Sequence, residues 1–355
     1  MCATRMYRRC IVTLLIVFFA VSIACPLGFA AETAIRVDPA KTIHSDIETP
    51  FEINITVSQV SDLAGWEFRL YYPNAMLNGT ELEEGPFLKT AGPTLLLSKT
   101  FSDSYNATHG LVWVACSLMT AGPGAEGNGT LATITFEPKS IGTGIFQLAE
   151  TDLLDSKFPE PQHLPHTRVD GVFRLGISDV AVMGIITSKT GCLPMPTIGL
   201  TFSTRVNVAI ENLGNFTETF NVTLEVSKLG IGSKSRIAVQ SVSLTPGAKG
   251  SLSFAWNTTG FTYGNYTLDA VASILSDENN VTNNVYVDGW IVLTIIGDYN
   301  GDFEVGPADF ALFATAYGST PERPSWNPNC DVNDDYKVGP ADFAQLSAHY
   351  GQQYP

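Results

Sequence analysis

Short runs in which apolar and polar residues alternate make up most of the chain between Ala34 and Ile295. Residues 51–57 and 66–72 show this alternation clearly, and Gly, Pro, Asn and Asp residues lie between such runs. A period of two residues predicts β-strands with one buried face. No stretch before Leu175 sustains the 3.6-residue period of an amphipathic helix. We therefore expect an all-β sandwich or barrel over residues 31–176.

A second series of strands is predicted for residues 177–296. Turn signals at residues 212–215, 246–247 and 279–280 separate its apolar runs. About seven strands in about 120 residues are typical of an immunoglobulin-like sandwich. The boundary near Gly176 follows from strand spacing alone. The predicted strands of this module include residues 180–182, 205–210, 221–226, 251–256, 266–272 and 290–294.

The pattern changes abruptly after Ile296, where Asp, Asn and Gly residues are followed by helical periodicity. Residues 298–311 are repeated as residues 331–344, at an offset of 33, and a Tyr-Gly pair closes both copies. Apolar residues at i, i+3, i+4 and i+7 after each loop predict a helix. Proline at the first helical position and glycine after the last are typical of helix ends. We expect residues 297–355 to form two loop–helix units whose aromatic faces pack on each other.

The repeated loop carries the oxygen ligands that calcium prefers. Calcium takes roughly six to eight oxygens, which such a loop supplies from side chains at positions 1, 3, 5 and 12 and from the backbone carbonyl at position 7. Both copies have this spacing, so we expect two calcium ions as cofactors. The predicted ligands are Asp298, Asn300, Asp302, the carbonyl of Glu304 and Asp309, then Asp331, Asn333, Asp335, the carbonyl of Lys337 and Asp342.

Position 6 of each loop lacks the usual glycine, because Phe303 and Tyr336 occupy it. This position requires a sharp turn in the left-handed backbone region, where a residue with a side chain costs about 1 kcal/mol. We therefore expect these loops to bind calcium more weakly than loops with glycine.

The first thirty residues have the organisation of an export signal. Arg5, Arg8 and Arg9 precede the apolar run 11–24, which is shorter than the roughly 20 residues that span a bilayer. The small residues Gly28 and Ala30 suit the positions at which a signal peptide is cleaved. A second interpretation treats Cys25 as a lipid-attachment site. We expect a secreted or cell-surface protein with no membrane span once residues 1–30 are removed.

Nine Asn-x-Thr triplets, more than chance predicts, indicate N-glycosylation and therefore export. A preference of β-rich sequences for threonine explains part of the excess. The candidate asparagines are Asn54, Asn78, Asn106, Asn128, Asn215, Asn221, Asn257, Asn265 and Asn280.

The chain has a formal net charge of −15. An acidic surface repels nucleic-acid phosphates and suits calcium, so we expect no nucleic-acid partner. The 6 cysteines are scattered, which favours buried thiols over a disulfide framework. His163 and His166 have the spacing of a metal-ligand pair, but no nearby Cys or paired His completes a site and a proline separates them. We find no catalytic constellation and expect no enzyme.

Residues 297–355, with tandem calcium loops and Asp rather than Glu at position 12, resemble the dockerin family. Dockerins bind cohesin domains of other proteins, so the resemblance implies a cohesin-bearing partner. It places the partner contacts at loop positions 10 and 11 and along the following helix. Those loop positions hold Pro307, Ala308, Pro340 and Ala341. Since the two pairs are the same, the resemblance allows either helix to dock.

The two predicted sandwiches also resemble known families. Residues 31–176 resemble a cohesin, which implies a jelly-roll β-sandwich with one flat sheet face for a dockerin-bearing partner. Residues 177–296 are similar to the cell-adhesion-related CARDB domains, which implies a spacer or a surface-binding module. The matching segments are 63–73, 127–136 and 170–173 in the first module, and 208–214 and 256–260 in the second.

Two functions remain open at this point. The first is an extracellular, non-catalytic scaffold or adaptor that assembles proteins through calcium-dependent cohesin–dockerin contacts, with polysaccharide breakdown as one setting. The second is a carbohydrate-binding or adhesive cell-surface protein. A row of exposed aromatic residues on the first sandwich would favour a polysaccharide ligand, and a flat aliphatic face would favour a dockerin. Both partners of one interaction in a single chain also predict self-assembly.

Overall fold

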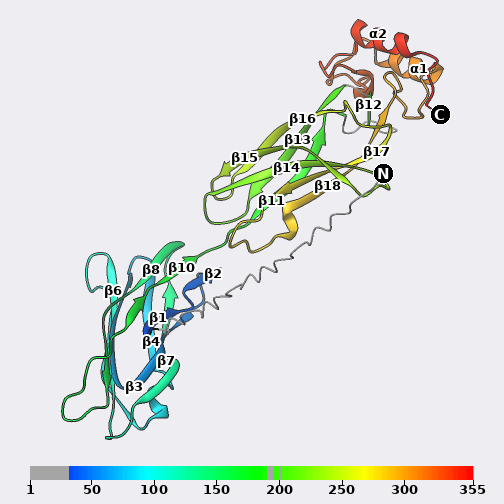
Figure 1. The fold of residues 1–355 in the computed structure, drawn as a ribbon. Coiled ribbons are helices and arrows are strands. Elements are labelled where there is room, and N and C mark those ends of the chain that lie inside the picture. Colours follow the sequence, from blue (N-terminus) through cyan, green and yellow to red (C-terminus); the bar gives the residue numbers. More distant parts are fainter. Residues whose placement is uncertain (1–31, 190–195, 200–201, 355) are drawn as a thin grey trace, which may run out of the picture.

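The computed structural model describes residues 32–189, 196–199 and 202–354. Three modules follow one another along an elongated molecule, with the first sandwich at one end and two helices at the other (Figure 1). This mostly β fold with two short C-terminal helices confirms the predicted fold class. The predicted export signal, Cys25 and Cys192 lie outside the described residues. Within those residues, no helix has the length and apolar character needed to cross a membrane.

The first module is a two-layered sandwich built around β3. β3 pairs with β1 and β7 through its first half and with β6 and β8 through its second half. The strands are β1 (Ala34–Asp38), β2 (Lys41–His44), β3 (Phe51–Pro73), β4 (Leu77–Glu84), β5 (Thr94–Ser102), β6 (His109–Leu118), β7 (Ala125–Pro138), β8 (Gly142–Asp155), β9 (Thr167–Val169) and β10 (Gly171–Leu175), with a 3-10 turn at Leu88–Thr90.

A bend in the middle of β3 lets one strand serve both layers. Gln59 and Asp62 have positive φ angles of 54° and 61° at this bend. The Asp62 carboxylate accepts hydrogen bonds from the Gly124 N–H and the Ser156 hydroxyl, both at 2.7 Å. These bonds hold the bend, and the alternating apolar residues on either side of it enter one common core.

The second module has a three-stranded sheet in the order β11-β13-β16 and a five-stranded sheet in the order β12-β18-β17-β14-β15. Its buried apolar residues form a second core between the sheets. The strands are β11 (Val180–Thr187), β12 (Thr197–Gly199), β13 (Ser203–Asn212), β14 (Glu218–Lys228), β15 (Lys234–Leu244), β16 (Lys249–Asn257), β17 (Gly264–Ala272) and β18 (Val285–Thr294), with a 3-10 turn at Thr282–Asn284.

The third module contains α1 (Pro307–Ala316), a 3-10 turn at Pro328–Cys330 and α2 (Pro340–His349). Phe313 and Leu346, one from each helix, are buried in its core. This core extends into the second module, because the partly buried side chains of Phe202 and Tyr263 pack against it. The second and third modules are therefore joined by a shared apolar core.

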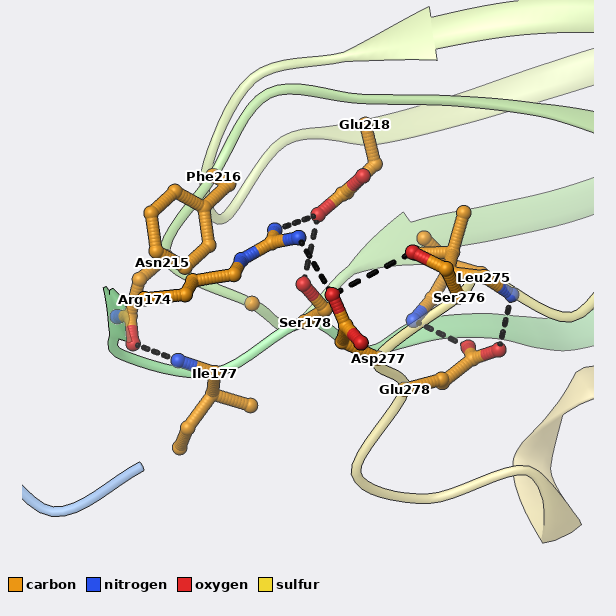
Figure 2. A network of polar contacts seen from close by, with 12 residues as sticks. Arg174, Ile177, Ser178, Asn215, Phe216, Glu218, Leu275, Ser276, Asp277 and Glu278 are labelled. Carbon is orange, nitrogen blue, oxygen red and sulfur yellow. Dashed lines mark hydrogen bonds and ion pairs between the residues drawn. The ribbon is translucent and has the colours of Figure 1, made fainter. Parts of the chain in front are cut away.

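The first and second modules meet in a network of polar contacts around Arg174 (Figure 2). The Arg174 guanidinium donates to Glu218 at 2.6 Å, lies 3.7 Å from Asp277, and stacks 3.9 Å from the centre of the Phe216 ring. Lys41 of β2 also pairs with Asp277, at 2.6 Å. Charged side chains from both modules are thus linked at the junction.

The strands that the sequence pattern did not single out include β5 and β15. Each pairs with a single neighbour and forms the edge of its sheet. Edge strands are more exposed on both faces, so their apolar alternation is weak. The described cysteines, Cys116 and Cys330, are buried thiols, as expected.

Candidate metal centre

The first loop of the third module brings three carboxylates together at one point. Oxygens of Asp298, Asp302 and Asp309 lie within 4.8 Å of one another. Asp298 and Asp309 are buried, whereas Asp302 is exposed. Asn300 joins them, because its Nδ2 donates to Asp302 Oδ2 at 2.8 Å. These are the predicted side-chain ligands at loop positions 1, 3, 5 and 12.

Backbone N–H groups hold these carboxylates in place. Asp298 accepts from the N–H groups of Gly301, at 2.7 Å, and Phe303, at 2.8 Å. Asp309 accepts from Tyr299 at 2.7 Å and, with its other oxygen, from Gly306 at 2.9 Å. The position-12 carboxylate therefore ties the start of the loop to the start of α1. The loop curls around the place where the three carboxylates meet.

The second loop repeats this hydrogen-bonding pattern. Asp331 accepts from the Tyr336 N–H at 2.9 Å, and Asp342 accepts from Val332 and, through its other oxygen, from Gly339, both at 2.8 Å. The remaining predicted ligands follow the first loop, because Asn333 Nδ2 donates to Asp335 Oδ2 at 2.9 Å and the Lys337 N–H donates to Asp335 Oδ1 at 3.0 Å. In the part of the chain that the structure describes, however, only the first loop places oxygens of three carboxylates within 4.8 Å of one another.

Burial makes both position-1 aspartates costly to ionise. Desolvation raises the pKa of Asp298, although hydrogen bonds from Thr294 and the loop backbone oppose the shift. Desolvation likewise raises the pKa of Asp331 to about 6, against the opposing charge of Lys189. Buried carboxylates that converge with amide oxygens form a donor set suited to a hard cation. The residues of both loops fit calcium by this chemistry, and the first loop fits it more closely.

The aromatic residues at position 6 adopt the left-handed backbone that the spacing predicts. Phe303 and Tyr336 have φ angles of 66° and 64°. Their rings contact other parts of the chain: the Tyr336 ring lies 5.4 Å from the Arg205 guanidinium, and the Phe303 ring lies 6.1 Å from that of Tyr354. The sequence indicated the backbone strain at this position but not these contacts.

The predicted partner-contact residues lie at the first turns of α1 and α2, and all four are exposed. They are Pro307, Ala308, Pro340 and Ala341. They lie on the same helices as an aromatic surface that the sequence pattern assigned to the core.

This aromatic surface consists of Phe310, Tyr317, Phe343 and Tyr350, which are 48%, 54%, 43% and 53% exposed. Two hollows of about 400 Å³ and about 350 Å³ share Phe310 and Phe343 as walls. Their other lining residues correspond at the offset of 33, so one hollow repeats the other. The expectation that the helix faces pack on each other is therefore met only in part. Phe313 and Leu346 of these faces are buried, and the Phe343 ring lies 5.6 Å from the Phe313 ring, but the four residues of the aromatic surface stay exposed.

No family model matches this chain, and no curated protein matches it. Among solved structures, the chain is similar to a non-cellulosomal cohesin from the hyperthermophilic archaeon Archaeoglobus fulgidus, at 14% identity and a TM-score of 0.31, over 41% of this chain and 91% of that one. It is also similar to a type II cohesin domain from the cellulosome of Acetivibrio cellulolyticus, at 14% identity and a TM-score of 0.33, over 40% and 95%.

A third similar structure is the seventh ScaB type I cohesin from Pseudobacteroides cellulosolvens, at 13% identity and a TM-score of 0.31, over 41% of this chain and 92% of that one. Each match thus covers a part of the chain about as long as the first sandwich. Likeness at this level concerns the fold of one module and carries no functional argument.

The outward face of β3, β6 and β8 carries a cluster of charged and aromatic side chains. The Arg69 guanidinium stacks 5.1 Å from the centre of the Trp113 ring and forms an ion pair with Glu150. Trp113 Nε1 donates to Glu67 at 2.7 Å. Tyr71, two residues after Arg69 on the same strand, continues this row.

Exposed aliphatic residues flank this cluster. Leu95 and Leu97 on β5 and Ile145 on β8 are 49%, 63% and 54% exposed. A cleft of about 770 Å³ extends the face from Ile145 to Arg174 at the junction with the second module. The face therefore combines two half-buried aromatic residues, Tyr71 and Trp113, with the exposed aliphatic residues expected of a protein surface.

The two histidines with metal-like spacing have other contacts. His163 Nδ1 lies 2.6 Å from Asp152, and His166 contacts the Thr151 hydroxyl and the Leu164 carbonyl, both at 2.8 Å. Their contacts are thus with different residues.

The candidate glycosylation sites differ in exposure. Asn106, Asn128, Asn221, Asn257 and Asn280 are exposed, whereas Asn54, Asn78, Asn215 and Asn265 are half-buried. Asn215 also accepts a hydrogen bond from the Ile177 N–H at 2.8 Å, at the junction of the first two modules (Figure 2).

Proposed function

We propose that this chain is an extracellular, non-catalytic adaptor whose C-terminal module binds two calcium ions and docks onto a cohesin-bearing protein. The observation that carries the proposal is the repeated loop geometry. In both loops the position-1 and position-12 carboxylates accept three corresponding backbone hydrogen bonds. This arrangement places four carboxylates in buried sites, which is unfavourable without a compensating cation. We therefore do not expect it to occur twice in an acidic linker that binds no ligand.

The first ion would be held by Asp298, Asn300, Asp302, the Glu304 carbonyl and Asp309, and the second by the corresponding residues of the second loop. Calcium would supply positive charge to buried carboxylates and would hold each loop against its helix. The exposed aromatic surface then serves as the docking face. Its two similar hollows suit a partner that approaches in either of two orientations, as the repeated Pro-Ala pairs also suggest.

The first sandwich is the proposed binding module for a second partner. Its face of Glu67, Arg69, Tyr71 and Trp113 suits a dockerin-bearing protein through ion pairs and aromatic contact. The alternative function, a carbohydrate-binding or adhesive surface protein, would use the half-buried rings of Tyr71 and Trp113, because sugars stack on aromatic rings. Assembly for polysaccharide breakdown would combine both roles.

The two proposed binding surfaces lie at opposite ends of the molecule (Figure 1). Contact between the first sandwich and the C-terminal module therefore requires two copies. If the two modules recognise each other, they would join copies head to tail into open chains rather than close on themselves.

Calorimetric titration of chain 32–355 with calcium tests this function. The wild-type chain should bind two ions, and the substitutions Asp298→Asn and Asp331→Asn should each remove one. Asp334→Asn is the matched control, since Asp334 lies in the second loop at position 4, which supplies no ligand, and asparagine tolerates its φ of 60°. A chain that binds no calcium, or equal loss in the control, would contradict the proposal.

Partner choice is tested by titrating the calcium-loaded chain with a cohesin, a dockerin and a soluble polysaccharide. Phe343→Ala should weaken cohesin binding without affecting the other two ligands. Trp113→Ala should weaken binding of the ligand of the first sandwich. If that ligand is the dockerin, the adaptor function is supported, and if it is the polysaccharide, the carbohydrate-binding function is supported.

A further inference from the structure

The first calcium loop makes a direct contact with the end of the second module. Thr294, the last residue of β18, donates its hydroxyl proton to one carboxylate oxygen of Asp298. Both residues are buried, at 0% and 1% exposure. The position-1 ligand is therefore oriented by a side chain that belongs to a different module.

The second loop makes equivalent contacts with the second module. The Lys189 ammonium, 4% exposed, donates to the backbone carbonyls of Asp331 and of Pro328, the latter at 2.5 Å. The Arg205 guanidinium donates to the hydroxyl of Tyr336 and lies over its ring. Tyr336, at position 6, thus makes a side-chain contact across the module boundary that a glycine at this position could not make.

Asn329 links β12 to the first loop. Its Oδ1 accepts from the Thr197 N–H at 2.9 Å, and its Nδ2 donates to the Tyr299 carbonyl at 2.9 Å. Asn329, a residue of the third module, is therefore hydrogen-bonded both to the backbone of β12 and to the backbone of Tyr299, the residue after Asp298. The Thr197 amide proton reports directly on whether the two modules are docked.

Aromatic packing adds a further contact between the second module and the first loop. The ring of Tyr354, near the end of the chain, lies 4.6 Å from that of Tyr263 in the second module. The Tyr354 N–H donates to the carbonyl of Phe303, at position 6 of the first loop, at 2.9 Å. Side chains of the second module thus contact both loops and leave the aromatic surface of the helices exposed.

We propose that the end of the second sandwich is a structural part of the calcium centre, so that calcium binding and docking of the third module stabilise each other. Thr294 is the principal positioning residue, because its hydroxyl fixes the orientation of the Asp298 carboxylate. This inference rests on the proposed calcium binding. Coupling of this kind is reciprocal: whatever docking adds to calcium affinity, calcium adds to docking. The third module is then presented to its partner at a fixed orientation rather than on a flexible linker.

Substitution of Thr294 tests one direction of the coupling. In chain 32–355 carrying Asp331→Asn, which leaves only the first loop to titrate, Thr294→Val should weaken calcium binding about tenfold. The estimate follows from the loss of a hydrogen bond to a charged group. Thr294→Ser, which keeps the hydroxyl, should retain the affinity. Thr267→Val is the matched control, because the Thr267 hydroxyl bonds to Ser227 within the second module.

Hydrogen exchange in the otherwise unaltered chain 32–355 tests the other direction and does not depend on any variant folding. Chelation of calcium should raise exchange at the Thr197 amide at least tenfold, while amides paired between β14 and β15 stay protected. Unchanged protection at Thr197, or equal affinities for Thr294→Val and Thr294→Ser, would overturn the inference and leave calcium binding intact. A chain that binds no calcium at all would overturn both proposals.

Discussion

Replacement of Arg174 by methionine should loosen the junction between the first two modules. Arg174 links the modules through Glu218, Asp277 and the ring of Phe216 (Figure 2). The side chains of Arg174, Glu218 and Asp277 are 19%, 13% and 9% exposed, so the network is largely shielded from water. Methionine keeps much of the length and apolar surface of arginine but removes its charge and its donors.

The expected loss of stability at the junction depends on which charged groups the substitution leaves unpaired. Breaking a fully buried ion pair by removing one partner costs about 3–5 kcal/mol. Two contacts reduce this cost here, because Glu218 keeps the Ser178 hydroxyl at 2.9 Å and Asp277 keeps Lys41 at 2.6 Å. The remaining exposure reduces it further. We expect a loss of about 2 kcal/mol, which corresponds to an increase of roughly thirtyfold in local opening.

Native-state hydrogen exchange at the Ile177 amide reports on this opening, because that N–H, at the start of the second module, donates to Asn215, the residue next to Phe216 of the network. Arg69→Met is the matched control: Arg69 also forms an ion pair and stacks on a ring, but its partner Glu150 is 59% exposed and lies on the outer face of the first sandwich. The control should cost less than about 1 kcal/mol and leave Ile177 unchanged. If Ile177 exchanges equally in both variants, the network does not hold the junction.

Three further outcomes are expected. The ion pair with Lys41, and then the charge of Arg174, hold the pKa of Asp277 below its ordinary value. Asp277 therefore contributes stability above an unfolded-state pKa of about 4 and loses it at lower pH, so thermal unfolding should show Asp277→Asn destabilised at pH 7 and approaching the unaltered chain as the pH falls below about 4. Phe313→Ala should destabilise the third module by about 3–5 kcal/mol in denaturant unfolding, while Phe343→Ala, at an exposed position, should cost far less; similar losses would contradict the assignment of core and surface. Glycopeptide mass spectrometry of the protein from a glycosylating host should find fuller occupancy at exposed Asn280 than at half-buried Asn54, and the reverse order would contradict exposure as the deciding factor.

The two helices show that a sequence pattern can predict a helix without predicting which of its apolar residues are buried. Apolar spacing predicted both helices, and the structure has them at Pro307–Ala316 and Pro340–His349. The same spacing assigned Phe310 and Phe343 to a buried interface, yet both are exposed. A helical period identifies an apolar face, but which of its residues are covered depends on the elements packed against it. Here Phe313 and Leu346 occupy the core, alongside Tyr299.

The sequence by itself determined the alternating strands, the repeated loops with their candidate oxygen ligands, and the helices that follow, because these features depend on residues close together in the chain. The left-handed backbone at Phe303 and Tyr336 was foreseeable for the same reason. Thr294 is only four residues from Asp298, but only the tertiary structure decided that Lys189 and Arg205 contact the second loop. Lys189 and Asp331 are 142 positions apart, and no local period connects them. Such contacts arise when whole modules pack together, since burial of a shared apolar core brings distant polar groups within reach of one another.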